Sequence, residues 1–155
     1  MTPAVRAAES AGIAHEVLAY EHDPNAEAYG EEAARALGVA PSAVFKTLVA
    51  KTDAGKLVVA VVPVANRLDP KALAAAVGAK RVDLAPPAEA ERATGYVVGG
   101  ISPLGQKRKL PTVLDASALA LPAIYVSAGR RGLEIRLAPA DLMRLTAAAT
   151  AAIAR

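Results

Sequence analysis

Two stretches of this sequence carry residues that could bind or polarise an anionic group, and the first centres on Lys46. This lysine is a single cation between Phe45 and Leu48 in an otherwise apolar run. At a strand rim its stem would pack while its ammonium stays in water. In a cleft, partial desolvation would strengthen its attraction for a carbonyl or phosphate oxygen and lower its pKa towards base chemistry. The pattern leaves both interpretations open.

The second stretch is "VGGISPLGQKRKLP", Val98 to Pro111, which combines two adjacent glycines with a Ser-Pro step. Glycine adopts backbone angles forbidden to other residues and lets a ligand reach main-chain N–H groups, so the loop from Gly99 to Pro103 could line a cavity. A simple turn or bulge between two strands explains the same residues. The loop lacks the length and the Gly-Lys-Ser ending of a nucleotide P-loop.

Positive charge follows this loop and recurs downstream. Lys107, Arg108 and Lys109 form one cluster, and Arg130 with Arg131 forms a second between glycines. Such clusters are often solvated faces, but they also suit phosphate contacts. Because aromatic residues make up only 3% of the chain, base stacking along a long nucleic-acid strand is disfavoured and a short terminus fits better.

Several kinds of chemistry are excluded or disfavoured. The chain has no cysteine, so it can form no disulfide and supply no thiolate nucleophile or ligand. Its two histidines, His15 and His22, stand apart from any acidic cluster with metal-ligand spacing. Ser102 lacks the G-x-S-x-G context of a nucleophilic serine. We therefore expect no metal and no cofactor.

The 155 residues predict one domain, residues 1–155, and a net charge of +3 permits an anionic partner without requiring one. No apolar run is long enough to span a bilayer, and Glu9 interrupts what a secretory signal would need. We expect a cytoplasmic protein that does not contact the membrane.

Hydrophobic periodicity and turn residues predict the elements that must position these residues. Two apolar runs, 43–51 and 56–65, predict a hairpin whose strands are buried on both faces. Further strands are expected over 15–20, 80–85, 112–117, 123–129 and 133–138. Helices are expected over 3–12, 27–38, 70–78, 86–95 and 140–155. The fold class is mixed α/β, and the grouping of strands after Leu110 argues against regular parallel winding.

With these residues assembled, the chain resembles the YbaK/EbsC family of aminoacyl-tRNA editing proteins. The resemblance spans essentially the whole sequence, and its most specific part is "VGGISPLGQK" together with an upstream "KT". It is carried by "MTPAV", "YEHDP" (20–24), "FKTL" (45–48), "TGYVVGGISPLGQKRKLPT" (94–112) and "IYVSAGRRGLEI" (124–135).

The resemblance implies a fold, an activity and partners. The fold is that of the editing domain of prolyl-tRNA synthetase, a barrel-like mixed sheet with surrounding helices. The activity is the removal of cysteine mischarged onto proline tRNA, an error that arises because a pocket rejects near-isosteres poorly. The implied partners are the acceptor end of aminoacylated tRNA and prolyl-tRNA synthetase.

The resemblance also implies roles for particular residues. Lys46 matches the essential lysine and Gly99 opens the family's G-x-x-x-P loop, so both are expected at the catalytic centre. Glu134 stands where an aspartate is expected near the substrate amine, so the charge is kept but a methylene is added. Substrate contacts are expected from Tyr20, Tyr29, Thr47, Gly100, Ile101, Ser102, Pro103 and Glu134. Phosphate contacts are expected from Lys107, Arg108, Lys109, Arg130 and Arg131.

In the mechanism that the resemblance implies, the substrate's own thiol attacks its ester carbonyl and the enzyme only orients the ester and stabilises the oxyanion. Two alternatives remain. The site could remove another small residue, alanine or serine, by water hydrolysis. The chain could also be a non-catalytic module that binds tRNA or a synthetase, although a pure binder would not require Lys46 together with the glycine loop.

Overall fold

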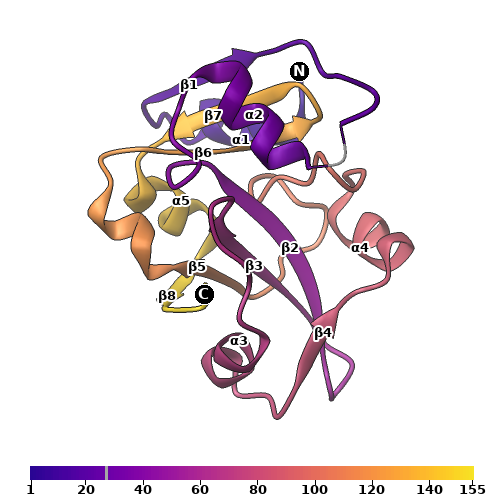
Figure 1. Ribbon diagram of the computed structural model, residues 1–155. Helices are drawn as coiled ribbons and strands as arrows, with labels where there is room; N and C mark the ends of the chain where they lie inside the picture. The colour runs from indigo at the N-terminus through magenta and orange to yellow at the C-terminus, as the bar shows by residue number, and fades with distance from the viewer. Residues whose placement is uncertain (27) are drawn as a thin grey trace.

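The two longest apolar runs form a β-hairpin at the centre of the molecule. In the computed structural model, which describes residues 1–26 and 28–155, β2 (Phe45–Thr52) pairs antiparallel with β3 (Leu57–Pro63) through a turn that contains Gly55 (Figure 1). Every residue of β3 is buried, because its two faces meet different core clusters. β2 is only partly buried, so the prediction of two buried faces is confirmed for β3 and wrong for β2.

The hairpin belongs to a five-stranded mixed sheet with the order β4-β2-β3-β5-β8. β4 pairs antiparallel with β2, whereas β5 pairs parallel with β3 and with β8. A second, antiparallel sheet has the order β1-β7-β6. The remaining strands are β1 (His15–Ala19), β4 (Val82–Leu84), β5 (Thr112–Asp115), β6 (Ile124–Arg130), β7 (Leu133–Leu137) and β8 (Ala149–Ala151).

The mixed α/β class is confirmed, but the expected barrel-like sheet is wrong. The two sheets meet at an isolated parallel bridge between Val44 and Tyr125, where the Tyr125 N–H donates to the Ala43 carbonyl at 2.9 Å. β4 and β8 remain edge strands of the larger sheet. The sheet stays open because β4 is short and pairs with β2 only from Ala50 to Thr52.

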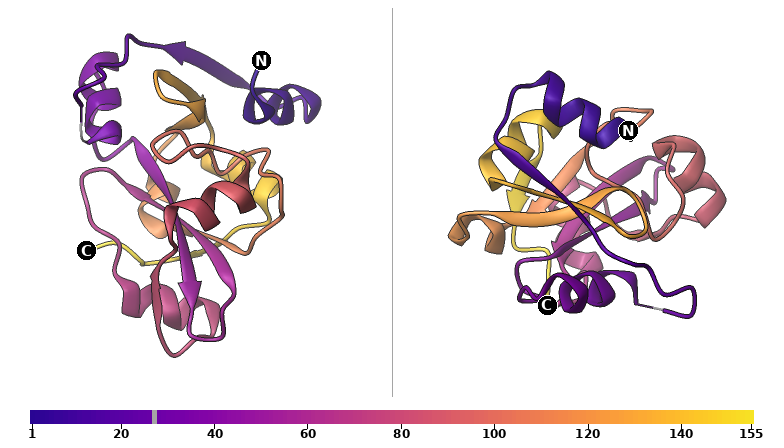
Figure 2. Two further views of the ribbon diagram at one scale, coloured as in Figure 1. Left: turned by 90° about the vertical axis from the view of Figure 1, so that its right-hand side faces the viewer. Right: turned by 90° about the horizontal axis from the view of Figure 1, so that it is seen from above.

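Among the described residues, five α-helices surround the sheets, and their ends follow the capping residues in the sequence. The Thr2 and Asp69 side chains accept hydrogen bonds from the first turns of α1 and α3, which both begin with proline. α3 lies at the end of the molecule opposite to α1 and β1 (Figures 1 and 2). The helices are α1 (Pro3–Ser10), α2 (Tyr29–Leu37), α3 (Pro70–Val77), α4 (Pro87–Thr94) and α5 (Pro139–Thr146). No helix in the described ranges has the length and apolar character that a bilayer crossing needs.

α2 contains a glycine near its start, which is unfavourable for a helix interior. A Cβ on Gly30 would lie 2.5 Å from Cγ2 of Val64, so the glycine lets the helix approach the end of β3 closely. The predicted helix over 27–38 is confirmed from Tyr29 to its left-handed cap at Gly38. Position 27 lies outside the described residues.

The C-terminal segment corrects another prediction. The expected helix over 140–155 ends at Thr146, Ala147 adopts a φ of 56°, and the chain then forms β8 beside β5. The Asp115 carboxylate accepts hydrogen bonds from the N–H groups of Ile153 and Ala154 at 2.9 and 3.1 Å. The open edge of β5 and this buried carboxylate therefore outweigh the helical preference of an alanine-rich segment.

Candidate functional site

A pocket of about 390 Å³ opens beside β2, where the starts of α2 and α4 and the turn at Gly99 converge. This volume lies in the usual range for small-molecule sites. Its walls are mostly apolar, with a few polar or titratable groups. Those groups are Tyr20, Tyr29, Glu31, Lys46, Thr47, Ser127 and Glu134.

The open edge of β2 forms one wall. The Val64 N–H donates to the Val44 carbonyl at 2.7 Å, and by alternation the next hydrogen-bonded pairs of β2 and β3 fall at Lys46 and Leu48. The main-chain groups of Thr47 therefore point to the opposite edge of β2. On that edge Val49 accepts from the Ala85 N–H at 2.9 Å, and β4 does not reach Thr47. The Thr47 Oγ1 atom is also shielded from solvent and has no hydrogen-bond partner among the described residues. Thr47 thus presents unused polar groups beside the pocket.

Lys46 lies at the mouth of the same pocket. Its Nζ donates to the Asn66 carbonyl at 3.0 Å, and the side chain is partly buried. Burial lowers the pKa of Lys46, nearby Arg67 lowers it further, and the carboxylate of Glu31 opposes both effects. The lysine is therefore a cation held in a partly desolvated position, which strengthens its effect on an incoming oxygen.

Glu134 lies inside the pocket with only 6% of its surface exposed. Burial raises the pKa of Glu134 to about 8, so the carboxyl group is mostly protonated at neutral pH. Tyr20, on the same pocket wall, has a raised pKa because of its own burial and the nearby Glu134. A substrate ammonium placed here would favour the ionised carboxylate and would release the proton.

Glu134 gives a testable dependence of stability on pH. Its pKa is higher in the folded than in the unfolded chain, so the folded state holds the proton longer as pH rises from about 4.5 to about 8. The contribution of Glu134 to the free energy of unfolding is therefore fully present below pH 4.5. It is lost as pH rises across that window, by roughly 3 to 5 kcal/mol in total. In Glu134→Gln this loss should disappear, which urea unfolding between pH 5 and pH 8.5 will measure.

The matched control for this measurement is Glu16→Gln, which changes an exposed carboxylate on β1. Its free energy of unfolding should follow the wild-type pH profile. If Glu134→Gln also runs parallel to wild type, Glu134 does not carry the buried proton.

The double glycine packs against the protein more closely than its bare sequence suggests. Gly99 has a φ of 92°, and a Cβ there would lie 2.6 Å from Nε of Arg131 and 2.7 Å from the Tyr29 ring. A Cβ on Gly100 would lie 2.8 Å from Cα of Arg130. Close contacts with other protein atoms thus require glycine at both positions.

The structure brings seven of the expected catalytic and substrate-binding residues to one pocket: Tyr20, Tyr29, Lys46, Thr47, Gly99, Ile101 and Glu134. Gly100, Ser102 and Pro103 do not line it. They are buried behind Gly99, where Ser102 accepts hydrogen bonds from the Leu104 N–H and from the Gln106 amide. These three residues therefore belong to the packed interior of the loop and not to the pocket wall.

The five basic residues lie in two places. Lys107, Arg108 and Lys109 are exposed at the C-terminal end of α4, where two of their N–H groups donate to carbonyls of the last helical turn. Arg130 is also exposed, whereas Arg131 is partly buried and its guanidinium lies 4.4 Å from the centre of the Tyr29 ring. Of the five residues, Arg131 thus lies closest to the pocket wall.

Some pocket residues had no signal in the sequence. Glu31 is one of two consecutive acidic residues at a helix start, and Ser127 is a strand residue. Leu84 and Pro87 add to the apolar wall. Tertiary contacts alone bring these residues together.

Comparison with known proteins agrees with this geometry. The sequence profile of a family described as "Aminoacyl-tRNA editing domain" matches residues 23–145. A protein of Enterococcus faecalis (strain ATCC 700802 / V583), provisionally named Cys-tRNA(Pro)/Cys-tRNA(Cys) deacylase EbsC, is 44% identical over 116 residues. That alignment covers 75% of this chain and 71% of the relative.

Solved structures agree over almost the whole length. A protein provisionally described as a trans-editing enzyme for prolyl tRNA synthetase has a TM-score of 0.86 and 28% identity, with 100% of this chain and 99% of that chain covered. A hypothetical protein of known structure has a TM-score of 0.89 and 27% identity, with 99% and 100% covered. These two structures therefore share the fold of this chain over almost its whole length.

Proposed function

Because the chain belongs to the aminoacyl-tRNA editing domain family, we propose that it is a trans-acting deacylase that removes cysteine from mischarged proline tRNA. The observation that carries this proposal is the shared pocket of Lys46, Thr47 and Gly99. A partly desolvated cation and free main-chain groups beside one small cavity suit an ester that must be oriented and polarised. We propose that residues 1–155 act as one editing domain.

In this proposal each pocket group has a separate task. The Lys46 ammonium attracts the ester carbonyl oxygen or the terminal phosphate, and the free main-chain groups of Thr47 contact the acyl end from the open edge of β2. Glu134 receives the substrate amine and gives up its proton when it does so. The turn at Gly99 confines the acyl group opposite Lys46.

The chain has no cysteine to act as a nucleophile, and the substrate can supply one. The cysteinyl sulfur attacks the ester carbonyl carbon, and the bond from that carbon to the ribose oxygen breaks. The thiol proton passes to the ribose oxygen, which leaves free tRNA and a cyclic thiolactone. Water later opens the thiolactone. The protein then contributes orientation and charge stabilisation only.

A comparison of three charged tRNAs tests this function. We expect the protein to deacylate Cys-tRNA(Pro), with thiolactone as the first product, and to leave Ser-tRNA and Ala-tRNA intact, because only cysteine carries the attacking sulfur. Product analysis by mass spectrometry measures the result. Equal loss of all three acyl groups would instead indicate hydrolysis by bound water, and no loss of any would indicate a non-catalytic tRNA-binding module.

The choice of tRNA is a further part of the proposal. The exposed cations at the end of α4 and Arg130 are few, which suits contact with phosphates of the acceptor end and weak binding to the rest of the tRNA. We therefore propose that selectivity comes from association with prolyl-tRNA synthetase in the cytoplasm. Addition of the synthetase should then lower the KM for Cys-tRNA(Pro).

A further inference from the structure

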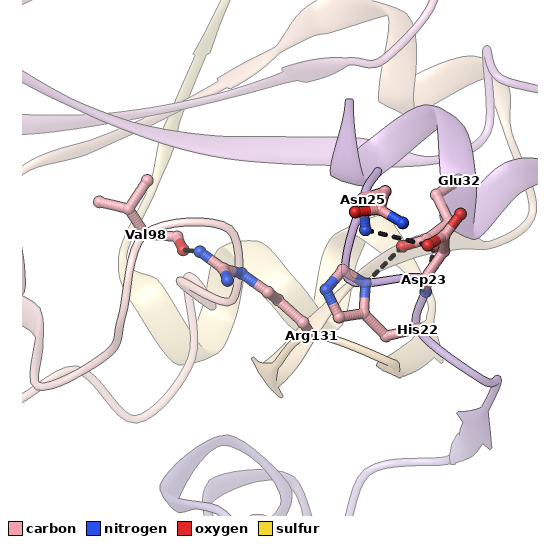
Figure 3. Close-up of polar contacts among 6 residues, drawn as sticks. All are labelled: His22, Asp23, Asn25, Glu32, Val98 and Arg131. Atoms are coloured by element: carbon pink, nitrogen blue, oxygen red, sulfur yellow. Dashed lines mark hydrogen bonds and ion pairs between the residues drawn. The ribbon is translucent and has the colours of Figure 1, made fainter. Parts of the chain in front are cut away.

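Arg131 joins two walls of the pocket that are far apart in the sequence. Its Nη2 donates to the Val98 carbonyl at 2.6 Å (Figure 3). Its guanidinium carbon lies 4.4 Å from the centre of the Tyr29 ring. Val98 and Tyr29 both line the pocket, from the glycine turn and from the start of α2. We refer to Arg131, Tyr29 and Val98 as the clasp.

The clasp brings the Gly99–Gly100 step against the Arg130–Arg131 step, which is distant in the sequence. The Gly100 Cα packs against the main chain of Arg130 and Arg131, and Gly99 leaves room for the guanidinium and the Tyr29 ring. The Arg131 Nε atom is shielded from solvent and has no hydrogen-bond partner among the described residues. Its guanidinium is therefore packed into the protein at this end and is not free to swing towards solvent.

The Tyr29 side of the clasp is anchored separately. The His22 ring lies 5.8 Å from the Tyr29 ring, and its Nδ1 is 2.7 Å from Oε1 of Glu32. The other Glu32 oxygen accepts from the Asp23 N–H at 2.7 Å (Figure 3). Glu32 is buried on α2, so these contacts tie the segment before α2 to the helix that carries Tyr29. Tyr29 is thus a fixed partner for Arg131.

We propose that Arg131 is a positioning residue that holds the Gly99 turn against Tyr29 and so sets the width of the pocket opposite Lys46. Its effect on turnover rests on the proposed function, whereas its effect on the glycine turn does not. This role differs from the phosphate contact that the sequence suggests for Arg131. The two roles make opposite demands on the side chain.

A phosphate contact needs a positive charge, whereas the clasp needs a planar guanidinium that stacks and donates in the same plane. Arg131→Lys keeps the charge and loses that geometry. In the clasp, Arg131→Lys and Arg131→Ala should both lower kcat for Cys-tRNA(Pro) by about 10- to 100-fold, as misplacement of a reacting group does, with little change in KM. Arg136→Ala, which removes an exposed arginine from β7, is the matched control and should match wild type.

A phosphate contact would give a different pattern of kinetic changes. If Arg131→Lys retains wild-type kcat while Arg131→Ala raises KM and weakens the salt dependence, Arg131 contacts phosphate and the clasp is wrong. The Tyr29→Leu variant adds a second check. In the clasp, the losses in kcat from Tyr29→Leu and Arg131→Ala should not multiply in the double variant, and multiplication would overturn the assignment.

Hydrogen exchange tests the clasp without any activity. The Gly100 N–H donates to the Val97 carbonyl at 2.8 Å and closes the turn that Arg131 holds. Its exchange should be about 10-fold faster or more in both Arg131 variants, because the turn opens locally, and unchanged in Arg136→Ala. Unchanged exchange in Arg131→Ala would overturn the clasp even if the protein acts on a different acyl group.

Discussion

Lys46→Ala is expected to reduce turnover of Cys-tRNA(Pro) by about 100-fold or more, the size of effect seen when one stabilising group is removed from a developing oxyanion. Lys46 is the cation on the pocket wall at the open end of β2, and its partial burial increases its effect on charge in the site. The fold should survive because the variant frees only the exposed Asn66 carbonyl, which water can satisfy. Single-turnover deacylation and circular dichroism measure the two effects.

The matched control for Lys46 is Lys71→Ala, which removes an exposed lysine from α3, away from the pocket. It should retain wild-type turnover. Deacylation by Lys46→Ala at the wild-type rate would remove the lysine from the mechanism and would leave the main-chain groups as the source of stabilisation.

Gly100→Ala is expected to cost about 1 to 3 kcal/mol of folding stability and to reduce turnover as well. The added Cβ would meet Cα and C of Arg130 at 2.8 and 3.0 Å and N of Arg131 at 3.0 Å. Main-chain atoms cannot move aside as a flexible side chain can, so the glycine turn and the Arg130–Arg131 segment must separate. Urea unfolding measures the cost, and single-turnover deacylation measures the effect on the site.

Gly38→Ala is a control that introduces backbone strain without the steric clash expected in Gly100→Ala. Gly38 caps α2 with a φ of 67° and has nothing within 4 Å of an added Cβ. Gly38→Ala should lower folding stability by about 1 kcal/mol, because alanine is strained in the left-handed conformation, and should leave turnover unchanged. If Gly100→Ala is as active and as stable as wild type, the Gly-Gly step does not pack as the structure indicates.

Local patterns in the sequence were enough to predict most elements. The hairpin, the proline-initiated helices and the glycine caps of α2, α3 and α4 depend on residues within a few positions of one another, as at Thr2 and Asp69. Lys46 and Gly99 could also be identified, because a lone cation in an apolar strand and a glycine-rich loop are visible without a fold.

Tertiary structure alone decided the rest. The segment after Thr146 became β8 because β5 offered a free edge and Asp115 offered a buried acceptor, and neither is near it in the sequence. The raised pKa of Glu134 arises from its burial in the pocket, and the need for glycine at position 100 arises from the main chain of Arg130. Sequence patterns record the preferences of neighbouring residues, whereas desolvation and close packing depend on which distant segments meet.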